Sequence, residues 1–260
     1  MFTVKRDPGV EAGMAGQQAA EADALGLWFN PPGEANTTRR VLTRERVVAE
    51  GLTVIAAVGA QALSMRALAA RLGVVPGALY RHVRNKEQLY DLILDAVLDE
   101  VDCQVDPGQP WTAQIAALAH RLRSVLEDHP GVAALLKTRD PLSPASLALA
   151  EAFLAPLLAA GLPGREAAQA FRIIYDYTLG FAVADPTSPA EQRLRDTTTR
   201  EQLRAFLRAL PTSRFPALAA HGIHVWSADR DQRFASGLDT LLRGLQADQR
   251  PPGTSPVPER

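Results

Sequence analysis

Cysteine is almost absent from this chain, since Cys103 is the only one among 260 residues. A single thiol excludes an intrachain disulfide and fits a reducing compartment. Cys103 itself is then either a redox sensor or an inert side chain. Long apolar runs are also missing, because none approaches the ~20 residues of a membrane span. The first residues include acidic side chains and no apolar signal core. We therefore expect a cytoplasmic protein that does not contact a membrane.

The usual signatures of catalysis are missing as well. We find no nucleophile elbow, no phosphate-binding loop, no metal cluster and no pair of carboxylates on one helical face. His120 and His129 have no further metal ligand at a useful spacing. We expect no enzyme activity, no metal and no cofactor. Strand signals are absent too, and apolar residues at helical spacing predict an all-α fold.

The most informative stretch that is present runs from Ser64 to Lys86. Its first part reads as a helix capped by Ser64 and ended by Gly73, because glycine takes a left-handed conformation at little cost. Pro76 suits the start of a second helix, where a missing N–H costs nothing. Leu79 and Val83 provide that helix with a buried side, and aromatic and basic residues cover its other side. This pattern is that of a helix-turn-helix DNA-reading unit.

Charge is unevenly distributed along the chain and agrees with this interpretation. Residues 42–90 carry seven basic side chains against three acidic ones, a net charge of +4, whereas the whole chain has a net charge of −1. A small positive module in an otherwise acidic protein is expected to face phosphate. The alternative is a two-helix fragment of an ordinary helical core with a solvated basic face.

The remaining sequence divides around this unit into four parts. We expect a flexible N-terminal extension at residues 1–38, or a misassigned start upstream of the fold. A three-helix DNA-binding domain follows at 39–90, then an all-α effector-binding and dimerisation domain at 91–247 and a disordered tail at 248–260. Within these parts Thr43 caps the first helix and Asn85 caps the fourth. Further helices are expected at 86–102, 111–129, 132–138, 143–161, 165–184, 201–210 and 232–245.

The chain resembles the TetR family of transcriptional regulators. The string that carries the resemblance is Leu68-Ala69, Leu72-Gly73-Val74, Leu79-Tyr80, His82-Val83, Asn85-Lys86 and Leu89. Near the other end, Phe234, Gly237-Leu238, Leu241-Leu242 and Gly244-Leu245 resemble the last helix of the tetracycline repressor branch, and Trp111 resembles the residue that opens its C-terminal domain.

The resemblance implies a homodimer whose N-terminal domains bind a double-stranded DNA operator. Tyr80, His82 and Lys86 match phosphate-contacting positions, and Arg66 matches a position that reads a base edge. The side chains of Val75, Gly77 and Ala78 cannot form hydrogen bonds. Base recognition is therefore expected to depend on arginine, on apolar contacts with thymine methyl groups and on DNA shape. The predicted DNA-contacting residues are Thr43, Arg66, Val75, Pro76, Gly77, Ala78, Tyr80, Arg81, His82 and Lys86.

The C-terminal domain is expected to bind a small-molecule effector between its helices. The lining candidates are Gln104, Leu118, Leu122, Leu135, Thr138, Phe153, Phe171 and Tyr175, each of which can equally be an ordinary core residue. Gln104 and Leu135 fall where the tetracycline repressor has the histidines of its magnesium–drug site. We therefore expect a different apolar or aromatic effector.

Dimerisation is expected to use the helices at 165–184 and 232–245, which together with their copies would form a four-helix bundle. The interface candidates are Ala167, Ile174, Phe181, Phe234, Leu238, Leu241 and Leu245. Phe171 fits either the pocket or the dimer seam. The predicted function is that of a repressor released by its effector; the alternatives are a DNA-binding dimer without an effector, and an activator.

Overall fold

The computed structural model describes residues 42–139, 142–183, 196–227 and 229–248, and these contain helices and turns but no strand. The helices are α2 (Arg44–Val58), the 3-10 turn η1 (Ala60–Ala62), α3 (Met65–Leu72), α4 (Pro76–Leu79), α5 (Lys86–Asp99), α6 (Trp111–Asp128), α7 (Val132–Leu136), α8 (Pro144–Ala159), α9 (Gly164–Val183), α11 (Thr197–Arg208), α12 (Pro216–Ser227) and α13 (Arg230–Asp248). The predicted all-α fold is confirmed. The predicted extension at 1–38 and nearly all of the predicted tail at 248–260 lie outside the described residues.

The chain forms two compact units. The first combines Met1–Glu100 with Arg139–Leu149, and the second combines Val101–Thr138 with Ala150–Arg260. The first unit thus contains the helix-turn-helix region and also residues 139–149, which follow it in the sequence only after α6 and α7.

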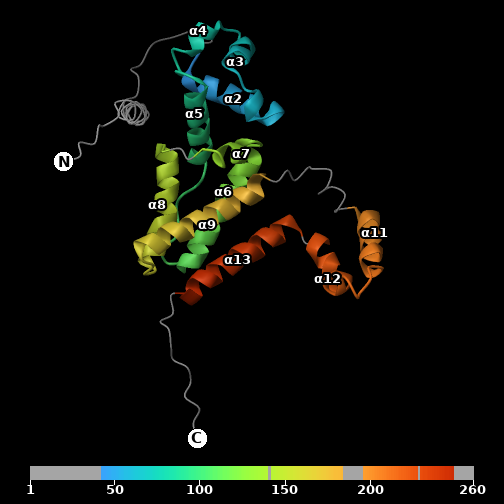
Figure 1. The fold of residues 1–260 in the computed structure, drawn as a ribbon. Coiled ribbons are helices and arrows are strands. Elements are labelled where there is room, and N and C mark those ends of the chain that lie inside the picture. Colours follow the sequence, from blue (N-terminus) through green and yellow to red (C-terminus); the bar gives the residue numbers. More distant parts are fainter. Residues whose placement is uncertain (1–41, 140–141, 184–195, 228, 249–260) are drawn as a thin grey trace, which may run out of the picture. The chain divides into compact units, whose positions relative to one another are not determined.

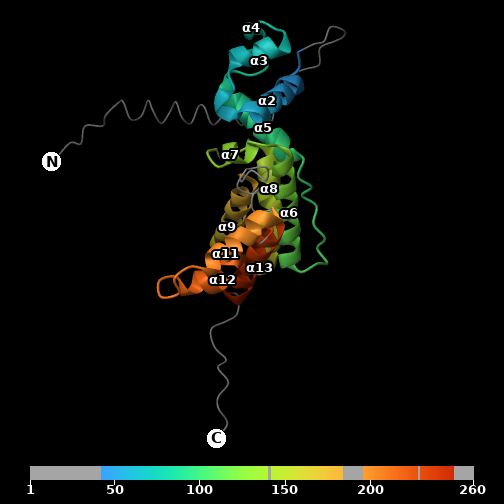
Figure 2. The ribbon, with the colours of Figure 1, turned by 90° about the vertical axis from the view of Figure 1, so that its right-hand side faces the viewer.

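The first unit is built around a close crossing of α2 and α5. Gly51 of α2 is buried, and a Cβ atom at this position would lie 2.7 Å from Cδ1 of Ile93 on α5. The absence of a side chain therefore lets the two helices approach. In Figures 1 and 2, α3 and α4 lie side by side next to this pair. The fully buried core residues of the unit include Ile55, Leu63, Leu68, Leu79, Leu89 and Ile93.

The second unit is centred on the packing of α6 against α9. Helices α7 and α13 also pack against α9, while α11 and α12 pack against each other (Figure 1). The fully buried core residues of this unit include Ile115, Leu118, Leu122, Phe153, Ile174 and Phe234.

A buried arginine joins α6 to α13. Arg123 is only 5% exposed, and its Nε donates to Glu127 over 2.9 Å while Nη2 donates to Asp231 over 2.5 Å. Its guanidinium carbon lies 4.7 Å from the centroid of the Phe234 ring. Arg230 of α13 pairs with the same Glu127 over 3.1 Å. Pairing of these cations with carboxylates and an aromatic face offsets the cost of removing them from water.

Two helices differ from the sequence expectation. α4 ends at Leu79, and residues 80–82 form a turn instead of continuing the helix. The N–H of His82 donates to the carbonyl of Leu79 three residues before it, over 2.8 Å, so the chain tightens at this point. α12 was not expected, because Pro216–Ser227 is apolar on nearly all sides and shows no clear helical spacing.

Candidate nucleic-acid interface and ligand site

The corner between α3 and α4 is made by hydrogen bonds that the sequence predicts. Ser64 Oγ accepts from a backbone N–H three residues later, over 3.1 Å. At the other end Gly73 has φ 69° and ψ 31°, a left-handed conformation that favours glycine. The N–H groups of Gly73 and Val74 donate to the carbonyls of Ala70 and Ala69, over 3.2 and 3.0 Å. This pair of bonds is a Schellman motif, and it turns the chain at once toward α4.

α4 is a single turn whose inner side is anchored in the core. Pro76 occupies its first position, where the absent N–H leaves nothing unpaired. Leu79 and Val83 are 0% and 1% exposed, as predicted. The neighbouring Val75 and Tyr80 are 70% and 52% exposed. The corner therefore presents an apolar and aromatic ridge to the outside.

None of the ten predicted DNA-contacting residues is buried, which is necessary for a surface that enters a DNA groove. The exposed ones are Arg66, Val75, Pro76, Gly77, Tyr80 and Arg81, and the half-buried ones are Thr43, Ala78, His82 and Lys86. Thr43 Oγ1 also accepts from the N–H of Arg46 over 3.3 Å and so caps α2. Hydrogen bonds from its own backbone N–H and from Thr43 lower the pKa of Glu45, which keeps this carboxylate charged.

The start of α5 is capped by Asn85, whose Oδ1 accepts from the N–H of Gln88 over 2.8 Å. The reciprocal bond differs from a standard capping box, because Gln88 Oε1 accepts from the N–H of Arg84 over 2.5 Å instead of from Asn85.

Lys86 follows this cap as the first residue of α5. Its Nζ donates to the carbonyl of Gln61 over 3.5 Å and lies 5.3 Å from the centroid of the Tyr90 ring. The ammonium group is thus held near the positive end of the helix dipole. A cation and unpaired helix N–H groups at one place favour a phosphate.

Comparisons with known proteins identify the family. Residues 47–93 match the model for bacterial regulatory proteins of the tetR family, and residues 105–249 match the tetracyclin repressor-like C-terminal domain. An HTH-type transcriptional regulator from Saccharopolyspora erythraea is 34% identical over 221 residues, which cover 85% of this chain and 91% of that protein. The chain belongs to the TetR family. It is therefore a DNA-binding transcriptional regulator, and the family and role predicted from the sequence are confirmed.

Further relatives of this TetR-family chain include repressors and a ligand complex. The HTH-type transcriptional repressor DrrR1 of Streptomyces coeruleorubidus is 29% identical, with 85% of this chain and 83% of that protein covered. The solved structure of Streptomyces coelicolor ActR in complex with actinorhodin has a TM-score of 0.72 and 30% identity, and covers 81% of this chain and 98% of that one. The partners predicted from the sequence, operator DNA, a small-molecule effector and a second copy, are those of TetR regulators.

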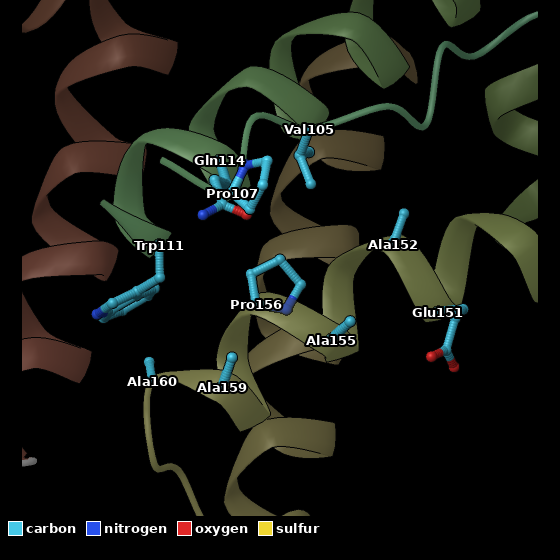
Figure 3. A pocket seen from close by; sticks show the side chains of 10 residues that line it. All are labelled: Val105, Pro107, Trp111, Gln114, Glu151, Ala152, Ala155, Pro156, Ala159 and Ala160. Carbon is cyan, nitrogen blue, oxygen red and sulfur yellow. The ribbon is translucent and has the colours of Figure 1, made fainter. Parts of the chain in front are cut away.

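A pocket of about 530 Å³ lies in the second unit of this regulator (Figure 3). One side is formed by Trp111 and Gln114 of α6 and by the loop before it, and the other side is the small-residue face of α8. Pro156 has no N–H to donate to the carbonyl of Ala152, so a backbone acceptor on α8 lacks its usual helical partner. The lining residues are Val105, Pro107, Trp111, Gln114, Glu151, Ala152, Ala155, Pro156, Ala159 and Ala160.

None of the eight predicted effector-binding residues lines this pocket. Leu118, Leu122 and Phe153 are fully buried, Leu135 and Tyr175 are 7% exposed, Phe171 is half-buried, and Gln104 and Thr138 are exposed. Three of them do come together, since the Phe171 ring lies 5.5 Å from Phe153 and 5.7 Å from Tyr175, centroid to centroid. These contacts place Phe171 against its own subunit. The assignment of the eight residues to an effector site stays a prediction.

The sequence reasoning missed the pocket because alanines carry no chemical signal of their own. The available signal was positional: Ala152, Ala155 and Ala159 recur at three and four residues on one face of α8, beside the proline that interrupts its hydrogen bonding.

Four of the seven residues predicted for the dimer interface belong to the core of one subunit. Ala167, Ile174 and Phe234 are 0% exposed and Leu238 is 1% exposed. Their side chains thus have no surface left for a second chain. Phe181, Leu241 and Leu245 are half-buried.

Proposed function

We propose that this chain is a cytoplasmic repressor that binds a palindromic operator as a homodimer and is released by a small apolar or aromatic effector. The observation that carries the proposal is the α3–α4 corner. Its core-facing residues are buried. Its aromatic, apolar and basic residues are exposed beside Lys86, at the N-terminus of α5. A dimer would present two such corners to successive major grooves, roughly 34–36 Å apart.

The DNA contacts divide by chemistry. Lys86, Tyr80 and His82 would hold phosphates, which fixes the position of the protein but reads no sequence. Arg66 and Arg81 carry the guanidinium groups that can bind guanine O6 and N7 through two hydrogen bonds. Val75, Gly77 and Ala78 would contact thymine methyl groups or allow a close approach.

For the dimer, we propose that the contacts lie on the outer face of α9 instead of on its buried core positions. Ile173 is 50% exposed there, beside the Arg172–Asp176 ion pair. An apolar residue flanked by charges is suited to a seam formed by the same face on two subunits.

For the effector, we propose that the Trp111–Pro156 pocket contributes to binding. Three alanines and Pro156 of α8 form one side of it, its other walls are mostly apolar, and Gln114 and Glu151 provide polar side chains. This lining suits a planar ring system with a hydroxyl or ammonium group that donates to an acceptor. The solved ActR structure with actinorhodin supports an effector in a protein of this fold.

The proposed function is tested by recovering the operator and then releasing it. Duplexes bound by the purified protein are selected from a random pool and should contain an inverted repeat. Aromatic compounds are then screened for release of the selected duplex.

A variant with a bulky side chain in the pocket tests whether the effector binds there. Ala155→Trp fills the pocket and should retain operator binding but lose release by the effector. Ala134→Trp, on the exposed side of α7, is the matched control and should respond normally. Normal release of the operator from the Ala155→Trp variant would show that the effector binds elsewhere. If no duplex is selected at all, the proposal that the protein is a repressor is wrong.

A further inference from the structure

α5 carries a row of acidic side chains spaced four residues apart: Glu87, Asp91, Asp95 and Asp99. Residues at this spacing lie on one face of a helix, and like charges there destabilise it. The expectation that no helical face pairs carboxylates was therefore wrong. The row starts directly after Lys86, so its charge opposes the approach of a DNA backbone to this end of α5.

The segment Arg139–Leu149 supplies partners for this row from within the same compact unit. Arg139 forms an ion pair with Glu87 through Nη1, and its Nη2 donates to Asp91 over 2.8 Å. At the start of α8, the N–H of Ala145 donates to Asp95 Oδ1 over 3.0 Å. Three of the four acidic groups of the row are thus bound by residues that lie far outside the helix-turn-helix sequence.

Arg139 also contacts the ring on which Lys86 lies. Its guanidinium carbon is 5.6 Å from the centroid of the Tyr90 ring, and Lys86 Nζ is 5.3 Å from the same centroid. Tyr90 is only 6% exposed, and its hydroxyl donates to the carbonyl of Ala60 in η1. Lys86 donates to the next carbonyl of η1, that of Gln61. One cluster therefore joins Arg139 to the first residue of α5 and to the turn before α3.

The guanidinium group of Arg139 stays protonated beside the carboxylates of Glu87 and Asp91. Burial lowers its pKa, but the hydrogen bonds and charges of Asp91 and Glu87 outweigh that effect and raise the pKa above its ordinary value. The guanidinium is therefore a permanent cation beside two carboxylates.

We propose that Arg139 is a positioning residue for DNA binding: it neutralises Glu87 and Asp91 and holds Tyr90, so that Lys86 meets the phosphate backbone without opposition. Arg139 lies in the part of the chain that matches the C-terminal domain model, not in residues 47–93, and it acts through Lys86 instead of contacting DNA. The proposal rests on the operator binding proposed above.

The test compares full-length variants by fluorescence anisotropy on an operator duplex and on a random duplex, with thermal unfolding recorded in parallel. Arg139→Ala should weaken binding to both duplexes by about three- to tenfold, because the lost compensation is independent of sequence. Arg139→Lys keeps the charge and should retain most of the affinity. Arg121→Ala removes the same charge from the second unit, where Arg121 pairs with Asp102 over 3.3 Å, and should bind as the wild type does.

A rescue variant separates positioning from mere stabilisation. Adding Glu87→Gln and Asp91→Asn to Arg139→Ala removes the uncompensated carboxylates and should restore the affinity for both duplexes. If Arg139→Ala does not fold, Arg139→Gln takes its place, because it removes the same charge but keeps a hydrogen-bonding side chain; it should weaken binding to both duplexes.

The possible negative results distinguish the role of Arg139 from the proposed function. Wild-type affinity of a folded Arg139→Ala or Arg139→Gln variant, or a folded rescue variant that stays weak, overturns the role of Arg139. A wild-type protein that binds neither duplex overturns the proposed function instead.

Discussion

Lys86 and Arg66 are both basic and lie on the same DNA-reading unit, yet they should act differently. Lys86 sits at the capped start of α5, where a phosphate is favoured, so Lys86→Ala should weaken binding to operator and random DNA alike. The slope of log affinity against log salt should fall by about one unit. Arg66 is exposed on α3, on the outer surface of the helix-turn-helix unit. Arg66→Ala should cost about 1–3 kcal/mol at its cognate base pair and relax specificity there.

These two variants are compared by titrating operator, single-base operator variants and random duplex at several salt concentrations. Identical losses for both variants on all duplexes would show that the assignment of phosphate and base contacts is wrong.

We predict that His120 makes the stability of the second unit depend on pH. Its ring stands edge-on to Phe234, with centroids 5.0 Å apart. Burial and the nearby positive charge of Arg123 lower the pKa of His120 below its ordinary value, against the opposite effect of Asp231. The unfolded chain therefore takes up this proton first, near pH 6.5, as the pH falls. The stability that neutral His120 contributes is present above that pH and is lost as the pH falls toward the folded pKa.

Thermal unfolding between about pH 7.5 and 5.5 checks this prediction, since the range spans the ordinary histidine pKa. The wild type should lose stability toward the acid end, and His120→Gln should show a flatter profile. If the thermal stability of both proteins falls equally with pH, His120 is not the cause of the pH dependence.

At the scale of the helix, the packing of α9 against α13 depends on a glycine. The Tyr177 hydroxyl of α9 donates to the Phe234 carbonyl over 2.9 Å, and a Cβ atom at Gly237 would collide with that hydroxyl. Gly237→Ala should lower the free energy of unfolding by about 1–3 kcal/mol. Tyr177→Phe alone should cost about 0.5–1.5 kcal/mol, because it removes the hydrogen bond from the hydroxyl to the Phe234 carbonyl.

The double variant should lose less than the sum of the two, since the colliding oxygen is gone. Urea unfolding at constant protein concentration measures all three. Gly244→Ala, on the same helix with no atom within 4 Å of the new methyl group, is the control and should be neutral or stabilising. Additive losses in the double variant would contradict the contact.

Helix ends were more predictable than helix lengths, because caps are local chemistry. Ser64, Gly73 and Asn85 act as the sequence predicts, since each needs only its immediate neighbours. The length of α4 depends on where Leu79 and Val83 enter the core, which tertiary packing decides. α12 lacks helical spacing and is held against α11, so its sequence contains little evidence for it.

The DNA-contacting surface was predictable for a related reason. Its residues follow one another closely along the chain, and all ten are accessible. The pocket and the Arg139 cluster join residues from distant segments, such as Trp111 with Pro156 and Glu87 with Arg139. Such pairings arise from tertiary packing, which spacing within one helix does not encode.

At the scale of the whole molecule, release by an effector requires that the second unit alter the affinity of the first for DNA. The chain passes between the two units on either side of residues 139–149, the segment that neutralises α5. An effector changes operator affinity only by its differential affinity for the two states, typically 1–3 kcal/mol, or about 5–150-fold. A dimer that never responds to an effector, or an activator, would use the same DNA surface. The described residues include no helix long and apolar enough to cross a membrane.

Binding of the purified protein to DNA from its own upstream intergenic region decides whether it is an operator-specific regulator. It is measured at two salt concentrations with nonspecific competitor, and the stoichiometry is recorded. We predict saturable, competitor-resistant binding of one dimer per site. Weak binding that competitor removes and that depends steeply on salt at every sequence would contradict an operator-specific regulator of this region.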